Sequence, residues 1–419
     1  MGHTPDDGTL LDGTLLDGTP LDGTLPDTPP DTPLDTMDAD TPRAAAFDPT
    51  VQAWVLSRHA DVVEALRHPD LVVHGMTVEH RAASTEAHAA MHAAMHAAMA
   101  HRFAPNALAA WRTSMRDAAT RAVAALPAEG EVDLLRGYFR PWSLAVAMLV
   151  TEAPPDATAE CAHAAQVVFR AAATATSGAP HAETTHAVIA LAQQLATSHD
   201  AGHDAPHHIP LDAAGQVQTF VALCETLPAL LAGIWCALLQ RPDSLRAVRD
   251  DAAQLAPMIG ELLRLGSPSR AVFRECLVDT RIADIHLRAG DRVILRLDAA
   301  NRDPAHFANP HQLQSARRQS GHLAFGAGRH ACAGAALVRM AVEVASEALV
   351  ARLADLIPAD IPSGVFQDHA ALSASDMPLS DIPASLPDRF AGGYAIRSPA
   401  HVMVRFLRHT PEANGTTPP

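Results

Sequence analysis

A glycine-rich loop that carries a cysteine and leads into a helix constrains this chain more than any other segment. Residues 325–334 read FGAGRHACAG. Gly326 and Gly328 permit backbone angles and close approaches that a Cβ would obstruct. Cys332 precedes a helix, where free N–H groups and the helix dipole stabilise a thiolate. Gly334, in the first turn of that helix, lets the backbone lie close to a ring, so the loop suits a thiolate placed against a flat cofactor.

The loop taken alone permits two interpretations. A glycine-rich turn beside a buried free cysteine is the plainer one, and it is favoured until other segments add support. The five cysteines of the chain are scattered, odd in number and without CxxC spacing. This pattern fits a reducing compartment better than a disulfide framework. It leaves Cys332 free for either role.

A long apolar helix, expected at residues 213–240, contains an acid and an alcohol side by side. A Glu in so apolar a helix is costly unless it is hydrogen-bonded, so Glu225 and Thr226 are either a capped or solvated polar step or part of a site. Pro228 lacks an N–H and should free the carbonyl of Cys224, kinking the helix. A bilayer span needs roughly 20 mostly apolar residues, but the Glu and the Pro favour a buried core helix here.

Two further groups of polar residues have helical spacing. Glu261 and Arg264 lie one turn apart, and such a pair by itself is usually a weak surface contact. His88, His92 and His96 line one face of a helix and could bind zinc. No third ligand type and no general-base Glu sits at metalloprotease spacing, so a zinc protein is a remote alternative.

The first 43 residues differ from the rest of the chain. They repeat the unit DGTLL and related sequences, and ten Asp fall between Asp6 and Asp40 with no Lys or Arg before Arg43. The segment is too poor in bulky apolar groups to offset its ordering entropy, so we expect residues 1–43 to be a disordered tail. Much of the net charge of -16 lies in this tail. The remaining mildly acidic globule argues against unspecific nucleic-acid binding.

After the tail no Pro/Gly-rich linker interrupts the chain, so we expect one domain, residues 44–408, and a flexible tail, residues 409–419. Alanine and leucine dominate and strand-like runs are short, which predicts a mainly α fold. Because no basic region precedes an apolar run at the N-terminus, no signal peptide is expected and the protein should be cytoplasmic. The periodicity predicts helices at 60–67, 86–101, 107–126, 141–151, 159–176, 184–198, 213–240 and 333–356, and two shorter helices within 244–265. It predicts strands at 54–57 and within 281–297 around a turn at 289–291.

The ten residues of the cysteine loop resemble the signature F-G-x-G-x-H-x-C-x-G of the bacterial soluble cytochromes P-450, with every defined position satisfied. The flanking residues 322–324 and 337–339 are also similar to the family, and the resemblance covers roughly residues 45–408. It implies a triangular helical prism with a small β-rich lobe. It also implies that Cys332 is the axial ligand of a haem iron, that His330 reaches a haem propionate, and that Phe325, Gly326 and Gly334 contact the haem.

The same resemblance assigns roles to polar residues elsewhere. Glu261 and Arg264 correspond to the ExxR motif, which implies a buried structural network with Arg317. Arg274 occupies the position from which the family directs an arginine at a propionate. The alternative interpretation is that Arg274 is a solvated arginine on a strand.

The histidine helix and the apolar helix also correspond to family motifs. His92 and His96 align with an H-x-x-x-R pair that contacts propionates, with His96 in place of the arginine. Glu225 and Thr226 correspond to the acid–alcohol pair of the long helix, which implies that Thr226 orients dioxygen and that Glu225 relays protons. Leu223 stands where the family usually has glycine, which implies a narrower or reshaped groove above the iron.

The resemblance implies a haem-thiolate monooxygenase that contains haem b and oxidises a small apolar substrate, a secondary metabolite. Two electrons would come from NAD(P)H through a ferredoxin-type donor and its reductase. Arg102, Arg329 and Arg339 are candidates to meet an acidic ferredoxin. The resemblance further implies a monomer without a membrane anchor.

Alternatives stay open at the level of chemistry. The same scaffold could perform an atypical oxidation, namely coupling, desaturation or ring rearrangement, which these motifs do not distinguish from hydroxylation. A non-catalytic haem sensor would not need Glu225 and Thr226, so substitution of both residues separates a sensor from an enzyme.

Overall fold

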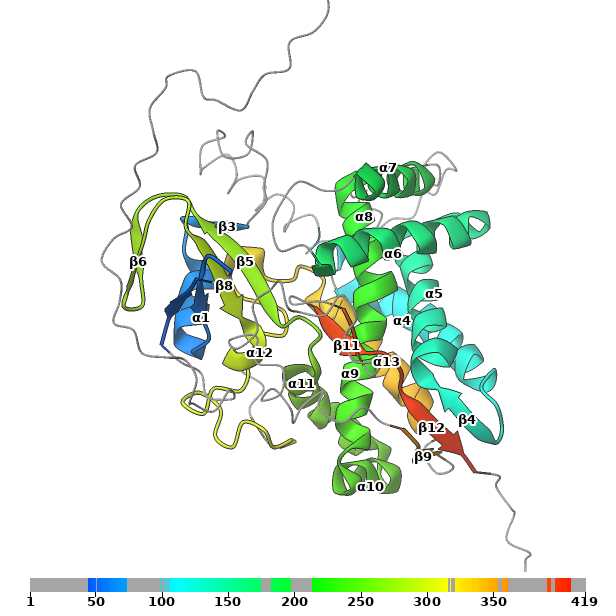
Figure 1. The fold of residues 1–419 in the computed structure, drawn as a ribbon. Coiled ribbons are helices and arrows are strands. Elements are labelled where there is room, and N and C mark those ends of the chain that lie inside the picture. The colour runs from blue at the N-terminus through cyan, green and yellow to red at the C-terminus, as the bar shows by residue number, and fades with distance from the viewer. Residues whose placement is uncertain are drawn as a thin grey trace, which may run out of the picture. The chain divides into compact units, whose positions relative to one another are not determined.

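The structure, a computed structural model, divides the chain into two units, residues 1–37 and 38–419. All of the residues that it describes belong to the second unit (Figure 1). The described residues are 44–49, 51–73, 99, 102–103, 105–174, 182–196, 213–315, 317, 321–352, 356–360, 390–392 and 396–407. The expected tails, residues 1–43 and 409–419, and the expected histidine helix up to residue 98 lie outside this part of the chain.

Apolar helices form the larger core. Helix α4 (Pro105–Ala124) packs against α13 (Ala335–Val350) and α5 (Arg140–Thr151), while α9 (Leu227–Leu239) packs against α11 (Leu255–Gly266). Every residue of α9 is buried, because Leu, Ala, Ile and Trp surround the whole helix and apolar surface is stabilised when it leaves water. This core places α9 and α13, which flank the candidate site, in one continuous packed cluster.

The long apolar helix is interrupted where the acid–alcohol pair occurs. Residues Ala213–Val221 form α8, Ala222–Thr226 form one π-helical turn, η4, and α9 follows. Pro228 cannot donate to the carbonyl of Cys224, and the N–H of Leu227 bonds instead to the carbonyl of Ala222. The kink that we expect at this point therefore takes the form of a π turn. The apolar stretch Gly215–Leu239 is long enough to cross a membrane, but 83% of its most apolar window is buried inside the protein, as expected of a core helix.

A five-stranded sheet forms the second packed region. Its strand order is β1-β2-β8-β5-β3, with β2 (Ala53–Leu56) and β8 (Arg292–Arg296) parallel and the other pairs antiparallel. The remaining strands of the sheet are β1 (Ala46–Asp48), β3 (Leu71–Val73) and β5 (Ala271–Cys276). Buried residues of β2 and β8 pack with helix α1 (His59–Arg67) in a core of their own. The sheet thus holds β5, which carries Arg274, beside the N-terminal helix.

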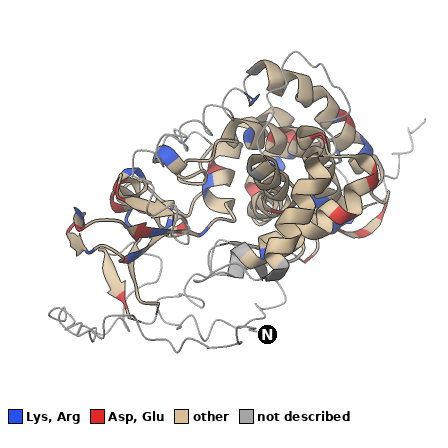
Figure 2. Cartoon of the chain, turned by 90° about the horizontal axis from the view of Figure 1, so that it is seen from above, with Lys and Arg blue, Asp and Glu red and all other residues tan. Residues whose placement is uncertain are grey.

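The other elements complete the helical and β-rich parts. These are helices α6 (Thr158–Thr174), α7 (Ala182–Ala196), α10 (Pro242–Asp250) and α12 (Leu297–Ala300); the short turns η1 (Leu135–Phe139), η2 (Pro155–Ala157), η5 (Ala252–Gln254) and η6 (Gly328–His330); and strands β4 (Gly130–Asp133), β6 (Thr280–Ile282), β7 (Ile285–Leu287), β9 (Leu356–Pro358), β10 (Phe390–Gly392), β11 (Arg397–Pro399) and β12 (Met403–Phe406). In the view of Figure 2, basic and acidic positions are interspersed along the helices. Ion pairs such as Arg116–Glu347, between α4 and α13, join some of them.

The mainly α class is confirmed, with two differences in detail. The final helix ends at Val350 rather than at residue 356, and Leu356 begins strand β9. The segment expected to form strands around one turn contains a separate hairpin, β6–β7, and its third strand, β8, pairs with β2 and β5 instead. Short strands whose partners lie far away in the sequence have no local signal beyond β-branched residues.

Candidate functional site

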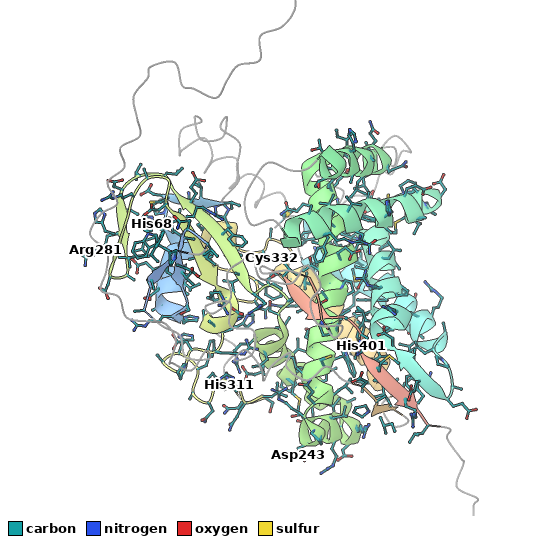
Figure 3. The ribbon with its side chains drawn as sticks, in the orientation of Figure 1. His68, Asp243, Arg281, His311, Cys332 and His401 are labelled. Carbon is teal, nitrogen blue, oxygen red and sulfur yellow. The ribbon has the colours of Figure 1, made fainter. Side chains whose placement is uncertain are left out.

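The cysteine loop has the geometry of a tight, glycine-dependent turn. Gly326 and Gly328 have φ angles of 68° and 71°, in the left-handed region that L-residues rarely adopt. The N–H of Cys332 donates to the carbonyl of Phe325 at 2.8 Å, which closes the loop immediately before α13. Cys332 is the one exposed cysteine, whereas the other four are buried. Figure 3 draws Cys332 between the β-rich part and the helical part.

The thiol of Cys332 has surroundings that call for a cation. Surrounding protein atoms raise the pKa of this thiol above its ordinary value, and the N–H of Gly334 opposes the rise only in part. A Cβ at Gly334 would lie 3.9 Å from the sulfur and 3.8 Å from Phe103, so the glycine leaves room beside the thiol. A thiolate here therefore needs a positive partner, and the iron of a cofactor would supply one.

Helix α1 packs against residues Gly328–His330 of the cysteine loop. A Cβ at Gly328 would approach the carbonyl of Leu66 to 2.5 Å, so only glycine allows this contact. Arg329 donates to the carbonyls of His68 and, over a shorter contact, Pro69 at the end of α1. No local sequence pattern predicts this contact, because it joins residues 260 positions apart. Its effect is to hold the loop from the side of the N-terminal sheet.

Arg274 is buried in β5 and lacks an acidic partner among the described residues. Its side chain is only 5% exposed. Among the described residues it donates to the carbonyl of Phe273, and its Nε has no partner there. Burial, with the nearby charge of Arg329, lowers the pKa of Arg274 to about 10. A buried guanidinium beside a second cation is stabilised by an anion. A haem propionate is an anion of suitable chemistry, and the half-buried His330 lies in the same loop as Arg329.

The structure places Glu261, Arg264 and Arg317 in one buried network. The guanidinium of Arg264 forms a bidentate contact with Glu261 at 2.7 and 2.9 Å, and Arg317 approaches the same carboxylate to 2.9 Å. Burial would raise the pKa of Glu261, but the two arginines outweigh it and hold the pKa below its ordinary value. Arg264 also donates to the carbonyls of Asn301 and Pro310 at 2.7 Å. The network thus fastens the segment that leads to the cysteine loop.

The π turn separates the acid from the alcohol. Gln218, Ala222 and Thr226 lie at intervals of four residues and form a partly exposed stripe on an otherwise buried helix. Glu225 is 5% exposed and faces α5, where Arg140 approaches its two oxygens to 3.1 and 3.4 Å. Burial raises the pKa of Glu225, and the ion pair with Arg140 limits the rise.

Leu223, which replaces the usual glycine, packs into the core at 2% exposure. It is therefore not part of the partly exposed stripe, and the stripe itself carries small and polar side chains. Arg140 was not singled out in the sequence. Its partner lies 85 positions away, so no local pattern indicates the ion pair.

Two groups of expected site residues have other outcomes. His92 and His96 lie outside the described residues. Within the described part of the chain no group of three or more His, Cys, Asp or Glu side chains is arranged to hold a metal ion.

Arg102 was expected to meet a redox partner, but this prediction is wrong, because its side chain is 4% exposed and donates to the carbonyl of Val150.

Comparisons with known proteins agree with this arrangement. The family model described as "Cytochrome P450" matches residues 253–357, which include Glu261, Arg274 and Cys332. The biotin biosynthesis cytochrome P450 of Bacillus subtilis is 35% identical over 136 residues, covering 32% of this chain and 34% of that protein. The cytochrome P450 monooxygenase PikC of Streptomyces venezuelae is 39% identical over 137 residues, covering 32% and 33%. These alignments therefore span about a third of the length of each relative.

The fold extends the likeness to most of the chain. The crystal structure of ligand-free CYP164A2 from Mycobacterium smegmatis superposes with a TM-score of 0.69. The match covers 85% of this chain and 92% of that one at 20% sequence identity.

Proposed function

The fold and the cysteine-loop signature are those of the bacterial cytochromes P450, and from this premise we propose that the chain is a haem-thiolate monooxygenase. Cys332 would hold the iron of haem b, while Arg274 and His330, with His92 and His96, would bind its propionates. Bound haem would supply dioxygen binding and one-electron chemistry. Two observations carry the proposal: the thiol of Cys332 is exposed, and Arg274, near the charge of Arg329 in the same loop, is buried without an acidic partner among the described residues. A group with a central cation and anionic arms would suit both.

The stripe on the long helix suits the oxygen side of such a site. Thr226 presents a hydroxyl that can donate and accept a hydrogen bond, and Ala222 leaves space one turn away. We assign to Thr226 the orientation of dioxygen and of a water molecule. The small, apolar side chain of Ala222 suits a small apolar substrate, and a secondary metabolite is our proposal for its class.

Glu225 and Arg140 provide a route for protons from solvent. The side chain of Arg140 is 41% exposed and that of Glu225 is 5% exposed, and they are joined at 3.1 Å. A carboxyl whose pKa is raised by burial can accept and release a proton closer to neutral pH than an exposed one. Glu225 would pass the proton to its neighbour Thr226 after parting from Arg140.

Electrons would reach the site from NAD(P)H through a ferredoxin-type donor and its reductase. A single catalytic domain, residues 44–408, acting as a cytoplasmic monomer, completes the proposal. The apolar helix that could span a membrane by length is part of the core, so it gives no support to a membrane anchor.

Turnover with a surrogate ferredoxin and reductase tests the proposal. Small apolar compounds would first be screened by the shift that they cause in the Soret band of the haem-loaded protein, and binders would be incubated with NADPH. We expect a product that gains one oxygen atom. A product mass that shows dehydrogenation or coupling would indicate the atypical oxidations instead.

Two variants separate the roles in the same assay. Thr226→Val keeps the shape of the side chain without its hydroxyl, so NADPH consumption should continue while hydrogen peroxide replaces product. Glu225→Gln should slow product formation about 100-fold, the lower end of the range for a positioned proton donor. Unchanged product yield in both variants would contradict the assigned roles, whereas the absence of product from every binder with the unmodified protein would favour a haem protein that is not an oxygenase.

A further inference from the structure

Arg339 contacts the cysteine loop from the helix that follows it. It lies in α13, and its guanidinium carbon is 5.1 Å from the centroid of the Phe325 ring. One of its terminal nitrogens lies 3.4 Å from Nε2 of His322. In the part of the chain that the structure describes, no carboxylate lies within ion-pair distance of Arg339. The side chain is half-buried, so it faces the loop rather than an acidic neighbour.

Phe325 transmits this contact to the cysteine. Its carbonyl accepts the N–H of Cys332 at 2.8 Å, and the next residue, Gly326, is fixed by a bond from its N–H to the carbonyl of Leu323 at 3.0 Å. The imidazole of His322 also lies near the ring, with centroids 6.0 Å apart. Movement of the Phe325 ring would therefore move the backbone atoms that position the sulfur.

The imidazole of His322 adds no second positive charge beside Phe325. Burial, reinforced by the charges of Arg339 and Arg264, lowers the pKa of His322 to about 4. His322 is therefore neutral at physiological pH, and Arg339 is the cation that faces the ring. An arginine over an aromatic face is attracted by the ring quadrupole, and the attraction grows when water is excluded.

We propose that Arg339 is a positioning residue for the axial ligand: its guanidinium clamps Phe325 and so holds the Cys332 backbone, and its charge raises the reduction potential of the site. The inference rests on the proposed role of Cys332. It assigns to Arg339 an inward function in place of the partner contact expected from the sequence. The two effects are separable, because the clamp needs a planar group over the ring and the potential needs only the charge.

The structure offers a matched control for this contact. Arg352, at the other end of the same helical segment, lies over the ring of Phe406 at 4.4 Å. It makes the same kind of contact just after the C-terminal end of α13, whereas Cys332 precedes the start of this helix. Arg352→Gln should therefore weaken packing there without any effect on the cysteine loop.

The test uses the haem-loaded full chain and two readouts. The first is the midpoint potential, measured by spectroelectrochemistry. The second is the rate at which the dithionite-reduced carbon monoxide form loses its red-shifted Soret band. Arg339→Gln should shift the potential to more negative values and accelerate the loss about two- to fivefold, as expected for one cation–ring contact. Arg339→Lys should restore the potential but not the full lifetime, and Arg352→Gln should leave both at the unmodified values.

The outcomes distinguish this inference from the proposed function. A red-shifted band in the unmodified protein, with Arg339→Gln unchanged in potential and lifetime, would overturn the inference alone. Equal shifts in Arg339→Gln and Arg352→Gln would also overturn it, since the effect would then be general loosening. Absence of the red-shifted band from the unmodified protein would sink both. In a Phe325→Leu background, Arg339→Gln should no longer change the lifetime, which shows that the clamp acts through the ring.

Discussion

Three polar side chains, the buried Glu225 and Arg274 and the partly buried His322, meet the cost of burial in three different ways. Glu225 is paired with Arg140, which reaches solvent. Arg274 has no acidic partner among the described residues, and an anionic cofactor would supply one. His322 avoids charge altogether, since its pKa falls to about 4. Burying an unpaired charge is expensive, so each of these solutions restricts what the site can bind.

The neutral state of His322 gives a pH dependence of stability. Its pKa is about 4 in the folded protein and 6.5 in the ordinary state, so the unfolded chain takes up the proton first as the pH falls. Stability should decline from about pH 6.5 downward, and the decline should be complete near pH 4. For this partly exposed group the total loss should be about 2 kcal/mol.

Urea unfolding of the unmodified protein and of His322→Gln, compared at about pH 7.5 and pH 5, checks this expectation. The difference between the two pH values should shrink in the variant, because the titrating group is gone. His286→Gln, an exposed histidine on β7, serves as the control. An identical pH dependence in all three proteins would show that His322 does not titrate as described.

Residues of the site differ in how far the sequence reveals them. The cysteine loop and the Glu261–Arg264 pair are local patterns, so their partners could be named before the structure. Arg317 was named only through the resemblance, since its contact with Glu261 spans 56 positions. Arg140 and the clasp of Arg329 on α1 were missed. Such contacts depend on which elements pack together, and side-chain type alone does not determine that.

At the scale of elements, the long helix shows how one residue reshapes a site. A regular α-helix through residues 222–226 would need a donor at position 228 for the carbonyl of Cys224, and proline has none. The π turn absorbs the mismatch. It turns Glu225 toward α5 and keeps Ala222 and Thr226 on the partly exposed stripe.

Restoring the missing donor should therefore change both stability and chemistry. Pro228→Ala should raise the free energy of unfolding by about 1 kcal/mol, less than the roughly 3 kcal/mol of a helix-interior proline, because the first turn of α9 tolerates it. It should also lower the ratio of product formed to NADPH consumed, since Thr226 would shift relative to Ala222. Chemical denaturation and product analysis measure the two effects.

Pro242→Ala is the matched control, because Pro242 lies in the first turn of the exposed helix α10. It should change the free energy of unfolding by no more than a few tenths of a kcal/mol. It should leave the ratio of product formed to NADPH consumed nearly unchanged. A less stable Pro228→Ala protein with an unaltered product ratio would contradict the link between the π turn and the site.

Elements with strong periodicity were predicted well, and the strands only in part. Helices α1, α4, α5, α6 and α7 begin and end within two residues of their expected bounds, and β2 lies one residue from the strand expected at 54–57. No bounds were predicted for β5, the strand that carries Arg274, since it has only six residues and pairs with β3 and β8 at distant positions. The π turn also has no periodicity of its own. Only Pro228 signalled that the helix would deviate there.

At the scale of the whole molecule, the chain combines a packed domain with a separate N-terminal unit. The contacts divide the chain at residue 37, close to the boundary at residue 43 expected from composition. We expect deletion of residues 1–43 to leave the midpoint of thermal unfolding within about 2 °C, because a shift of that size corresponds to only about 1.5 kcal/mol for a domain this large.

Scanning calorimetry of the haem-loaded full-length and shortened proteins measures this difference. Deletion of residues 1–57, which also removes β1 and β2 from the five-stranded sheet, provides the contrast and should lower the midpoint strongly. A drop of more than about 5 °C on removal of residues 1–43 alone would contradict the assigned boundary.

The central claim is that Cys332 is the thiolate ligand of a haem iron. The most direct measurement is the spectrum of the purified, dithionite-reduced protein with and without carbon monoxide. We predict a strongly red-shifted Soret band that is lost in Cys332→Ala and kept in Cys276→Ala, a change at a buried cysteine. A Soret band typical of imidazole ligation, or a protein that binds no haem, would contradict the account.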